Sequence, residues 1–260
     1  MTASADLRRS TKMPVLKECL GLGEFTRKGY SKLLKAFIAE FLGTMFLNFF
    51  GCASTIAWSE DNGPSVVQIA FAFGLAAAGV IQAIGHVSGG HINPAVTISM
   101  MLTSNITVLR ALLYVIAQCL GAIAGSGILR ALTPENVGGN LGTTIPESRL
   151  APVQAAGMEF FLGFILLLVV FGVCDPLRNL SHNAPIAIGF AILVGHLAAV
   201  PFTGSSMNPA RSLGSAVISG VWDNHWVYWL GPILGGTVAG LIYKHFFALR
   251  SPSEDLKSLP

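Results

Sequence analysis

Long apolar stretches alternate with short polar segments along most of this chain. Six stretches are about as long as the ~20 residues that a helix needs to cross a bilayer. They lie near 36–58, 66–85, 108–130, 153–174, 184–200 and 226–247. Two shorter apolar runs, 95–102 and 210–218, are only about half of that length. The pattern therefore predicts an all-α membrane protein with six transmembrane helices and two half-spanning, re-entrant helices.

Both half-length runs begin at an Asn-Pro-Ala tripeptide. The two boxes are Asn93, Pro94 and Ala95, and Asn208, Pro209 and Ala210. Asparagine accepts hydrogen bonds at a helix N-cap, and proline suits the first helical position. Irregular backbone at membrane depth occurs only where it is buried in protein or lines a water-filled cavity. Paired interrupted segments indicate an inverted repeat with a central site, so we expect two helix N-termini to meet in a pore.

Composition and charge support this class and give an orientation. Hydrophobic residues make up 52% of the chain and charged residues only 11%, which is extreme for a soluble domain. Eight of the 16 Lys and Arg residues precede the first span. The positive-inside rule therefore predicts cytoplasmic N- and C-termini, with Arg130 and Arg149 outside. This topology accounts for the basic N-terminus, so we expect no nucleic-acid partner.

A single channel domain, 33–247, is expected between two cytoplasmic tails, 1–32 and 248–260. It consists of repeat one (33–130), a linker (131–152) and repeat two (153–247). Small-residue motifs allow close helix contact, and they occur at Gly121-xxx-Gly125, Gly231-xxx-Gly235 and Gly236-xxx-Gly240. Because these motifs fall at matching places in the repeats, we expect them to pack the two halves against each other.

The paired boxes, the second of which continues into Arg211 and Ser212, resemble those of the aquaporin (major intrinsic protein) family, and the water-selective animal aquaporins in particular. The resemblance covers about residues 33–247 and includes the stretches 40–44, 85–91 and 231–236 together with Gln118. It implies the aquaporin fold, water as the permeant and a homotetramer with one pore per subunit. We expect a multi-pass protein of the lipid bilayer, in the plasma membrane.

By this resemblance, the selectivity filter consists of Phe73, His196, Ser205 and Arg211. The implied pore carbonyls are those of Gly89, Gly90, His91, Gly204, Ser205 and Ser206, opposite an apolar wall that includes Leu47, Ala77, Leu166 and Ile192. The expected function is passive, single-file conduction of water without protons or ions. The alternative is an aquaglyceroporin that passes glycerol or other small neutral solutes. That branch typically has a small residue in place of His196 and an aspartate in place of Ser212.

Two glutamates, Glu40 and Glu159, lie within apolar spans at equivalent places in the repeats. A buried carboxylate is costly. Two interpretations remain open: hydrogen-bonded support for the loop before each half-helix, or a proton relay. Ser181 follows Arg178 in an inner loop and is either a kinase site or an ordinary loop serine.

Other classes of function have weaker support in the sequence. His86 and His91 have no carboxylate or cysteine beside them, and no catalytic triad or phosphate-binding loop is evident, so we expect neither a metal, a cofactor nor an enzyme. A coupled transporter would need an ion site, whereas both half-helices present positive ends. A role in adhesion stays open alongside a pore.

Overall fold

The computed structural model describes residues 17–59, 63–178 and 180–249 of the chain. Six long helices cross it: α2 (Arg27–Ala53), α3 (Val66–Ser88), α5 (Val108–Leu132), α6 (Pro152–Cys174), α7 (Ala184–Thr203) and α9 (Val227–Ile242). Two helices are short: α4 (Pro94–Leu102) and α8 (Pro209–Ser219). Brief helical turns are η1 (Leu22–Phe25), η2 (Pro176–Arg178), η3 (Ser181–Asn183) and η4 (Tyr243–Phe247). Half of the expected N-terminal tail, residues 1–16, and most of the expected C-terminal tail, residues 250–260, lie outside the described residues.

The arrangement of long and short helices agrees with the hydropathy pattern. The helices α2, α3, α5, α6 and α7 are each long and apolar enough to span a membrane. Helix α9 has 16 residues and continues directly into the π-helical turn η4. The prediction of an all-helical fold with six spans and two half-length helices is confirmed.

The first long helix begins earlier than hydropathy predicts. It starts at Arg27, where the Thr26 hydroxyl caps it by accepting from the backbone N–H of Gly29 at 3.1 Å. It ends at Ala53 instead of residue 58, where the Ser54 hydroxyl donates back to the carbonyl of Gly51. Hydropathy marks the lipid-facing part of a helix, whereas caps set its ends. The boundary expected at residue 32 between tail and channel therefore falls inside α2.

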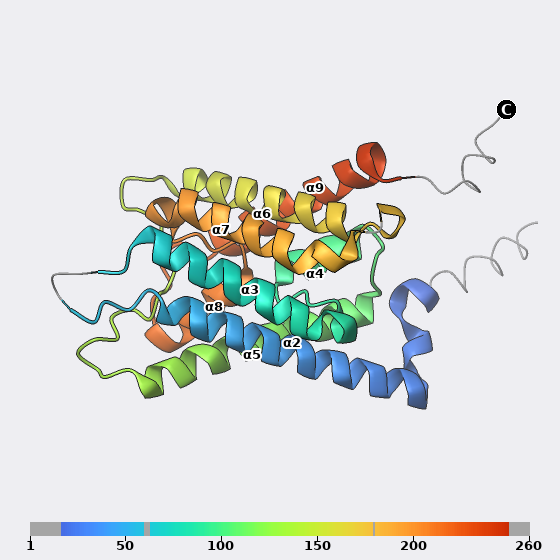
Figure 1. Ribbon diagram of the computed structural model, residues 1–260, viewed down its shortest axis with the longest axis horizontal. Helices are drawn as coiled ribbons and strands as arrows, with labels where there is room; N and C mark the ends of the chain where they lie inside the picture. The colour runs from blue at the N-terminus through green and yellow to red at the C-terminus, as the bar shows by residue number, and fades with distance from the viewer. Residues whose placement is uncertain (1–16, 60–62, 179, 250–260) are drawn as a thin grey trace, which may run out of the picture.

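The long helices run side by side and the short helices enter from opposite ends (Figure 1). Within one half, α2 packs on α3 and α5; within the other, α6 packs on α7 and α9. Both described chain ends lie at one end of the bundle, which we call the termini end, together with α4. The segment 131–152 and α8 lie at the opposite end, which we call the linker end.

Glycines bring the long helices of each half into close contact. A Cβ atom on Gly121 of α5 would overlap the Phe41 carbonyl oxygen of α2, and one on Gly235 of α9 would overlap the Phe160 carbonyl oxygen of α6. Each of these contacts joins two helices of the same half. The expectation that Gly121-xxx-Gly125 and Gly231-xxx-Gly235 pack the two halves together is therefore wrong, because matching positions in two repeats make matching contacts within each repeat.

Different small residues join the halves. Gly74 of α3 and Gly189 of α7 face each other, and a Cβ atom on either would lie 2.6–2.7 Å from the carbonyl oxygen of the other. Gly236 of α9 lies against Ser99 of α4. A Cβ atom on Gly236 would lie 2.8 Å from the Ser99 hydroxyl oxygen. The third motif, which begins at Gly236, thus does contact the opposite half. Helix α4 packs on α9 and α5, and α8 packs on α5, α2 and α9, so each short helix contacts long helices of both halves.

Candidate functional site

Two irregular loops lead into the half-helices, and both contain left-handed backbone. The residues with positive φ are Gly89 (95°), Gly90 (63°) and Ile92 (44°) in one loop, and Gly204 (76°), Ser205 (51°) and Met207 (57°) in the other. A β-branched residue such as Ile92 rarely adopts this conformation, which costs on the order of 1–3 kcal/mol. The surrounding contacts must therefore hold these loops in place.

Glu40 of α2 is fully buried and provides much of that support in the first half. One carboxylate oxygen accepts from the Ser88 hydroxyl at 2.6 Å and from the His91 N–H at 2.9 Å. The other accepts from the Ile92 N–H at 2.6 Å and from the Gln118 amide at 2.8 Å. Every partner is a donor, so the geometry of Glu40 is that of an acceptor for the loop.

Glu159 of α6 occupies the corresponding place in the second half. It is also fully buried, and one carboxylate oxygen accepts from the Thr203 hydroxyl at 2.7 Å and the Ser206 N–H at 2.9 Å. Its second oxygen accepts from the Met207 N–H at 2.9 Å. The same pattern of one hydroxyl and two consecutive backbone N–H groups thus recurs in both repeats.

Each loop is also held at its start by a tyrosine hydroxyl, a contact that the sequence analysis did not identify. The Tyr114 hydroxyl donates to the Ser88 carbonyl, and the Tyr228 hydroxyl donates to the Thr203 carbonyl, both at 2.8 Å. Ser88 and Thr203 each stand five residues before the asparagine of their box. That shared offset is a signal in the sequence from which the hydroxyl pair could have been found.

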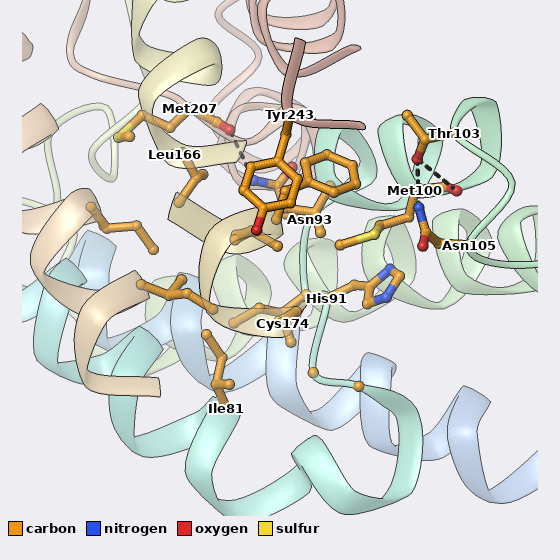
Figure 2. A pocket seen from close by; sticks show the side chains of 18 of the residues that line it. Ile81, His91, Asn93, Met100, Thr103, Asn105, Leu166, Cys174, Met207 and Tyr243 are labelled. Atoms are coloured by element: carbon orange, nitrogen blue, oxygen red, sulfur yellow. Dashed lines mark hydrogen bonds between the residues drawn. The ribbon is translucent and has the colours of Figure 1, made fainter. Parts of the chain in front are cut away.

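The two boxes meet and are joined across the repeats. Asn93 Nδ2 donates to the Met207 carbonyl at 2.9 Å, as Figure 2 shows, and Asn208 Nδ2 donates to the Ile92 carbonyl at 2.8 Å. Each asparagine also caps its own half-helix, where Oδ1 accepts from the N–H of Ala95 or Ala210. The N-termini of α4 and α8, with their partial positive charges, therefore face each other inside the protein.

Phe73, His196 and Arg211 form a second cluster, which we call the aromatic-arginine cluster. The rings of Phe73 and His196 are stacked with centroids 4.4 Å apart, and the Arg211 guanidinium carbon lies 4.8 Å from the Phe73 centroid. His196 Nδ1 lies 2.9 Å from the Ile192 carbonyl, which can only accept, so this nitrogen carries the proton. His196 Nε2 and Arg211 Nε are buried and have no partner among the described residues.

The linker positions Arg211 from the linker end. The Gly142 carbonyl accepts from Arg211 Nη1 at 2.6 Å, and the Thr144 hydroxyl lies 2.7 Å from that of Ser212. Sequence reasoning treated residues 131–152 only as a connection. The segment has no helical period, and nothing in its residue types indicates which carbonyl meets a guanidinium, so no sequence signal points to this role.

One cavity of about 490 Å³ connects these groups. Its lining extends from the aromatic-arginine cluster past Asn93 and Asn208 to Asp175, Tyr243 and Lys244 at the termini end. Figure 2 shows Asn93 and Tyr243 among the side chains that line it. Of the expected carbonyl residues, Gly89, Gly90, His91 and Ser206 line it, and so do Leu47, Leu166 and Ile192 of the apolar wall. Among the described residues around it, Gly204, Ser205 and Ala77 are not part of the lining.

The family of the chain follows from comparison with known proteins. Residues 28–243 match the family described as major intrinsic protein. The chain belongs to the major intrinsic protein family. It is 45% identical to aquaporin-4 of Mus musculus over 227 residues, which cover 86% of this chain and 69% of that protein. It is 44% identical to aquaporin-2 of Bos taurus over 228 residues, which cover 86% of this chain and 84% of that protein.

A solved structure of an aquaglyceroporin has the same fold. The X-ray structure of the aquaglyceroporin from Plasmodium falciparum aligns with a TM-score of 0.76 and 25% sequence identity, over 86% of this chain and 99% of that chain. The resemblance found in the sequence and the aquaporin fold expected from it are confirmed.

Half of the expected site residues of this major intrinsic protein line the cavity, and Ser205 and Ser181 are among those that do not. The Ser205 hydroxyl is buried without a partner among the described residues and lies outside the cavity lining. Ser181 begins the turn η3 and does not line the cavity. The geometry offers buried donors and acceptors along a passage, with positive helix ends at its centre.

Proposed function

We propose that this member of the major intrinsic protein family is a passive water channel that excludes protons and ions. The observation that carries the proposal is the pair of unpartnered polar atoms in the aromatic-arginine cluster. Arg211 Nε–H offers a donor and His196 Nε2 offers an acceptor, both buried at the cavity. A water molecule both donates and accepts, so it can pair with either kind of atom, while the stacked Phe73 ring narrows the passage.

The facing half-helices support the exclusion of protons. Asn93 and Asn208 each use one of two amide hydrogens on the opposite loop, which leaves the second hydrogen to donate to a water in the cavity. A water oxygen that accepts from both amides has its hydrogens turned away from the centre, and this breaks a continuous chain for proton transfer. The positive ends of α4 and α8 and the charge of Arg211 repel cations.

Further assignments complete the proposal. The selectivity filter consists of the aromatic-arginine cluster with Ser205, and carbonyls of both loops accept hydrogen bonds from passing water. Glu40 and Glu159 support the loops, since all their partners are donors. The protein acts as a homotetramer in the plasma membrane, without enzymatic activity or a cofactor. The termini end faces the cytoplasm, and Ser181 serves as a kinase site on that side.

Conduction of glycerol is the alternative, and it has less support. The aquaporin-4 and aquaporin-2 relatives are 44–45% identical, whereas the aquaglyceroporin of known structure is 25% identical. His196 also occupies space beside Phe73, with the ring centroids only 4.4 Å apart. A three-carbon polyol is wider than water and would need that space.

Stopped-flow light scattering on proteoliposomes tests the proposal directly. We expect rapid osmotic shrinkage with a low activation energy and no swelling in a glycerol gradient. Glycerol entry at a rate comparable to water would establish the alternative, and the absence of both fluxes in proteoliposomes with folded, reconstituted protein would contradict the channel function.

A double variant tests the aromatic-arginine cluster. Arg211→Val with His196→Ala removes the donor, the acceptor and much of the side-chain volume, so we expect glycerol to enter. The matched control is Arg130→Val with His225→Ala, which makes the same two substitutions outside the cavity lining. Continued exclusion of glycerol by the folded double variant would show that selectivity resides elsewhere.

A further inference from the structure

The two loops at the cavity are stabilised from outside in different ways. At the linker end, residues 142–147 contact the second half through Arg211, Ser212 and Phe202. The first loop leads into α4, which lies at the termini end, opposite to that linker. Its tyrosine, Tyr114, is instead contacted by Arg110, one turn earlier in α5. In the second half, Asn224 stands four residues before Tyr228, so the repeat does not supply an equivalent arginine.

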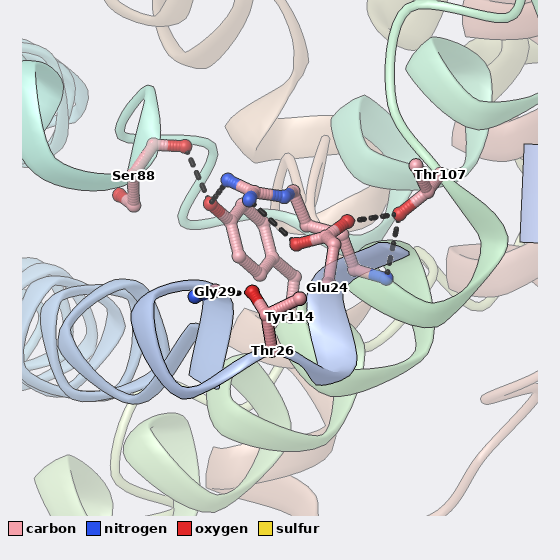
Figure 3. A network of polar contacts seen from close by, with 7 residues as sticks. Glu24, Thr26, Gly29, Ser88, Thr107 and Tyr114 are labelled. Carbon is pink, nitrogen blue, oxygen red and sulfur yellow. Dashed lines mark hydrogen bonds and ion pairs between the residues drawn. The ribbon is translucent and has the colours of Figure 1, made fainter. Parts of the chain in front are cut away.

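The turn η1, which precedes the first span, holds this arginine (Figure 3). Glu24 forms an ion pair with Arg110, with 2.7 Å between Oε2 and Nη2, and its Oε1 accepts from the Thr107 hydroxyl at 2.7 Å. Both charged side chains are largely covered, with 17% of Glu24 and 27% of Arg110 exposed. Burial alone would raise the pKa of Glu24, but the bonds from Arg110 and Thr107 lower it below its ordinary value. The carboxylate is therefore charged at neutral pH.

The contact continues from Arg110 to the cavity. Arg110 Nη1 lies 3.5 Å from the Tyr114 hydroxyl oxygen, which in turn donates to the Ser88 carbonyl (Figure 3). The Tyr114 side chain is fully buried, and its ring packs edge-on against the His91 ring at a centroid distance of 5.3 Å. Ser88 and His91 flank the two glycines of the loop. A displacement of Tyr114 therefore reaches both ends of the segment whose carbonyls line the cavity.

We propose that Glu24 and Arg110 are positioning residues of the pore: through Tyr114, the turn η1 fixes the Ser88–Ile92 loop and so sets the rate of water conduction. This inference rests on the proposed function, since its consequence is a change in water flux. Arg110 donates toward the Tyr114 oxygen and leaves the hydroxyl hydrogen free for the Ser88 carbonyl. The ion pair with Glu24 keeps the guanidinium at that place. An N-terminal segment outside the channel thereby controls the geometry inside it.

The first test measures unit water permeability, meaning osmotic permeability per reconstituted copy, in proteoliposomes. Glu24→Gln weakens the hold on Arg110, and Tyr114→Phe removes the final link, so each lowers unit permeability by about threefold to tenfold, the factor that corresponds to one net hydrogen bond. The two substitutions share one route, so the double variant is no slower than Tyr114→Phe alone. In contrast, Glu24→Gln and Tyr228→Phe act on different loops, and their effects multiply.

A charge exchange separates positioning from simple docking of the N-terminus. Glu24→Arg with Arg110→Glu restores an ion pair and hence thermal stability, but the carboxylate introduced at position 110 would accept the Tyr114 hydroxyl hydrogen and draw it away from Ser88. We expect stability to recover while permeability stays low. Recovery of both, or a loss of stability in Glu24→Gln with unchanged unit permeability, would overturn the proposal. Glu18→Gln, an exposed acid in the same segment, is the control.

Hydrogen–deuterium exchange decides the proposal without any flux measurement. Glu24→Gln is expected to accelerate exchange at the backbone N–H groups of residues 90–92, while those of residues 205–207 stay unchanged. Unchanged exchange in residues 90–92 would overturn the inference even if the protein conducts water. Accelerated exchange with no water flux in the unmodified protein would instead refute the proposed function and leave the mechanical link established.

Discussion

At the scale of single residues, two buried carboxylates counteract the strain of the loops. Ile92 has a φ of 44°, which a β-branched side chain adopts only when its surroundings enforce it. Its N–H donates to Glu40 at 2.6 Å, and the adjacent His91 N–H donates to the other oxygen. Both carboxylate oxygens are thus needed as acceptors. A carboxamide of the same shape has only one acceptor oxygen and adds donors of its own.

Glu40→Gln is therefore expected to destabilise the protein strongly. The amide nitrogen would face donors, and two buried groups would lose their acceptor, at a cost of about 2–5 kcal/mol in the free energy of unfolding. Unfolding in mixed detergent micelles, followed by circular dichroism, measures the change. Glu147→Gln, at a partly exposed position of the linker, serves as the control. Equal stability of both variants would mean that Glu40 does not support the loop.

The sequence predicts the charged residues of the cavity site better than the uncharged groups that hydrogen-bond to the same loops and to Arg211. Glu40 and Glu159 are conspicuous because a carboxylate within an apolar span is rare, and Arg211 follows directly from its box. The hydroxyls of Ser88 and Tyr114 are common residue types in any helix, so only the repeat offset or the structure identifies them. The Gly142 carbonyl is a backbone group, and no side-chain pattern encodes where it points.

At the scale of helices, the spacing of glycines decides which spans lie in contact. Hydropathy predicts that spans exist, but it does not indicate their neighbours, because every span is apolar. The contact of Gly121 with the Phe41 carbonyl joins α2 to α5, and the facing Gly74 and Gly189 join α3 to α7. In a bilayer, close van der Waals packing replaces the hydrophobic effect as the force between helices. The first pair therefore stabilises one half, and the second joins the halves.

Two glycines of α5 allow this to be tested within one helix. Gly121→Ala places a methyl group onto the Phe41 carbonyl oxygen, and we expect α2 and α5 to separate at a cost of about 1–3 kcal/mol. Gly127→Ala is the matched control, because its nearest neighbour is the Ile218 Cδ1 atom at 3.8 Å. In the same unfolding assay, Gly121→Ala should have a clearly lower free energy of unfolding than the control. Equal stabilities would contradict the close contact of α2 and α5.

At the scale of the whole molecule, the inverted repeat explains why one cavity serves both halves. The cross-repeat bonds from Asn93 and Asn208 require α4 and α8 to enter from opposite ends, as Figure 1 shows. Six long helices return the chain to the end from which it started. Hydropathy and the paired boxes predict this topology, whereas the asymmetric support, η1 at the termini end and the linker at the other, emerges only when the chain is folded.

The distribution of charge then determines how the molecule lies in its membrane. Lys32, Arg178 and Lys244 represent the basic residues of the termini end, whereas the linker end has Arg130 and Arg149. Basic segments stay on the cytoplasmic side during insertion. We expect an epitope inserted at Gly139, where a side chain would meet no atom within 4 Å, to bind antibody on intact cells. An N-terminal epitope should bind only after permeabilisation, and the reverse pattern would show that the protein is oriented the other way.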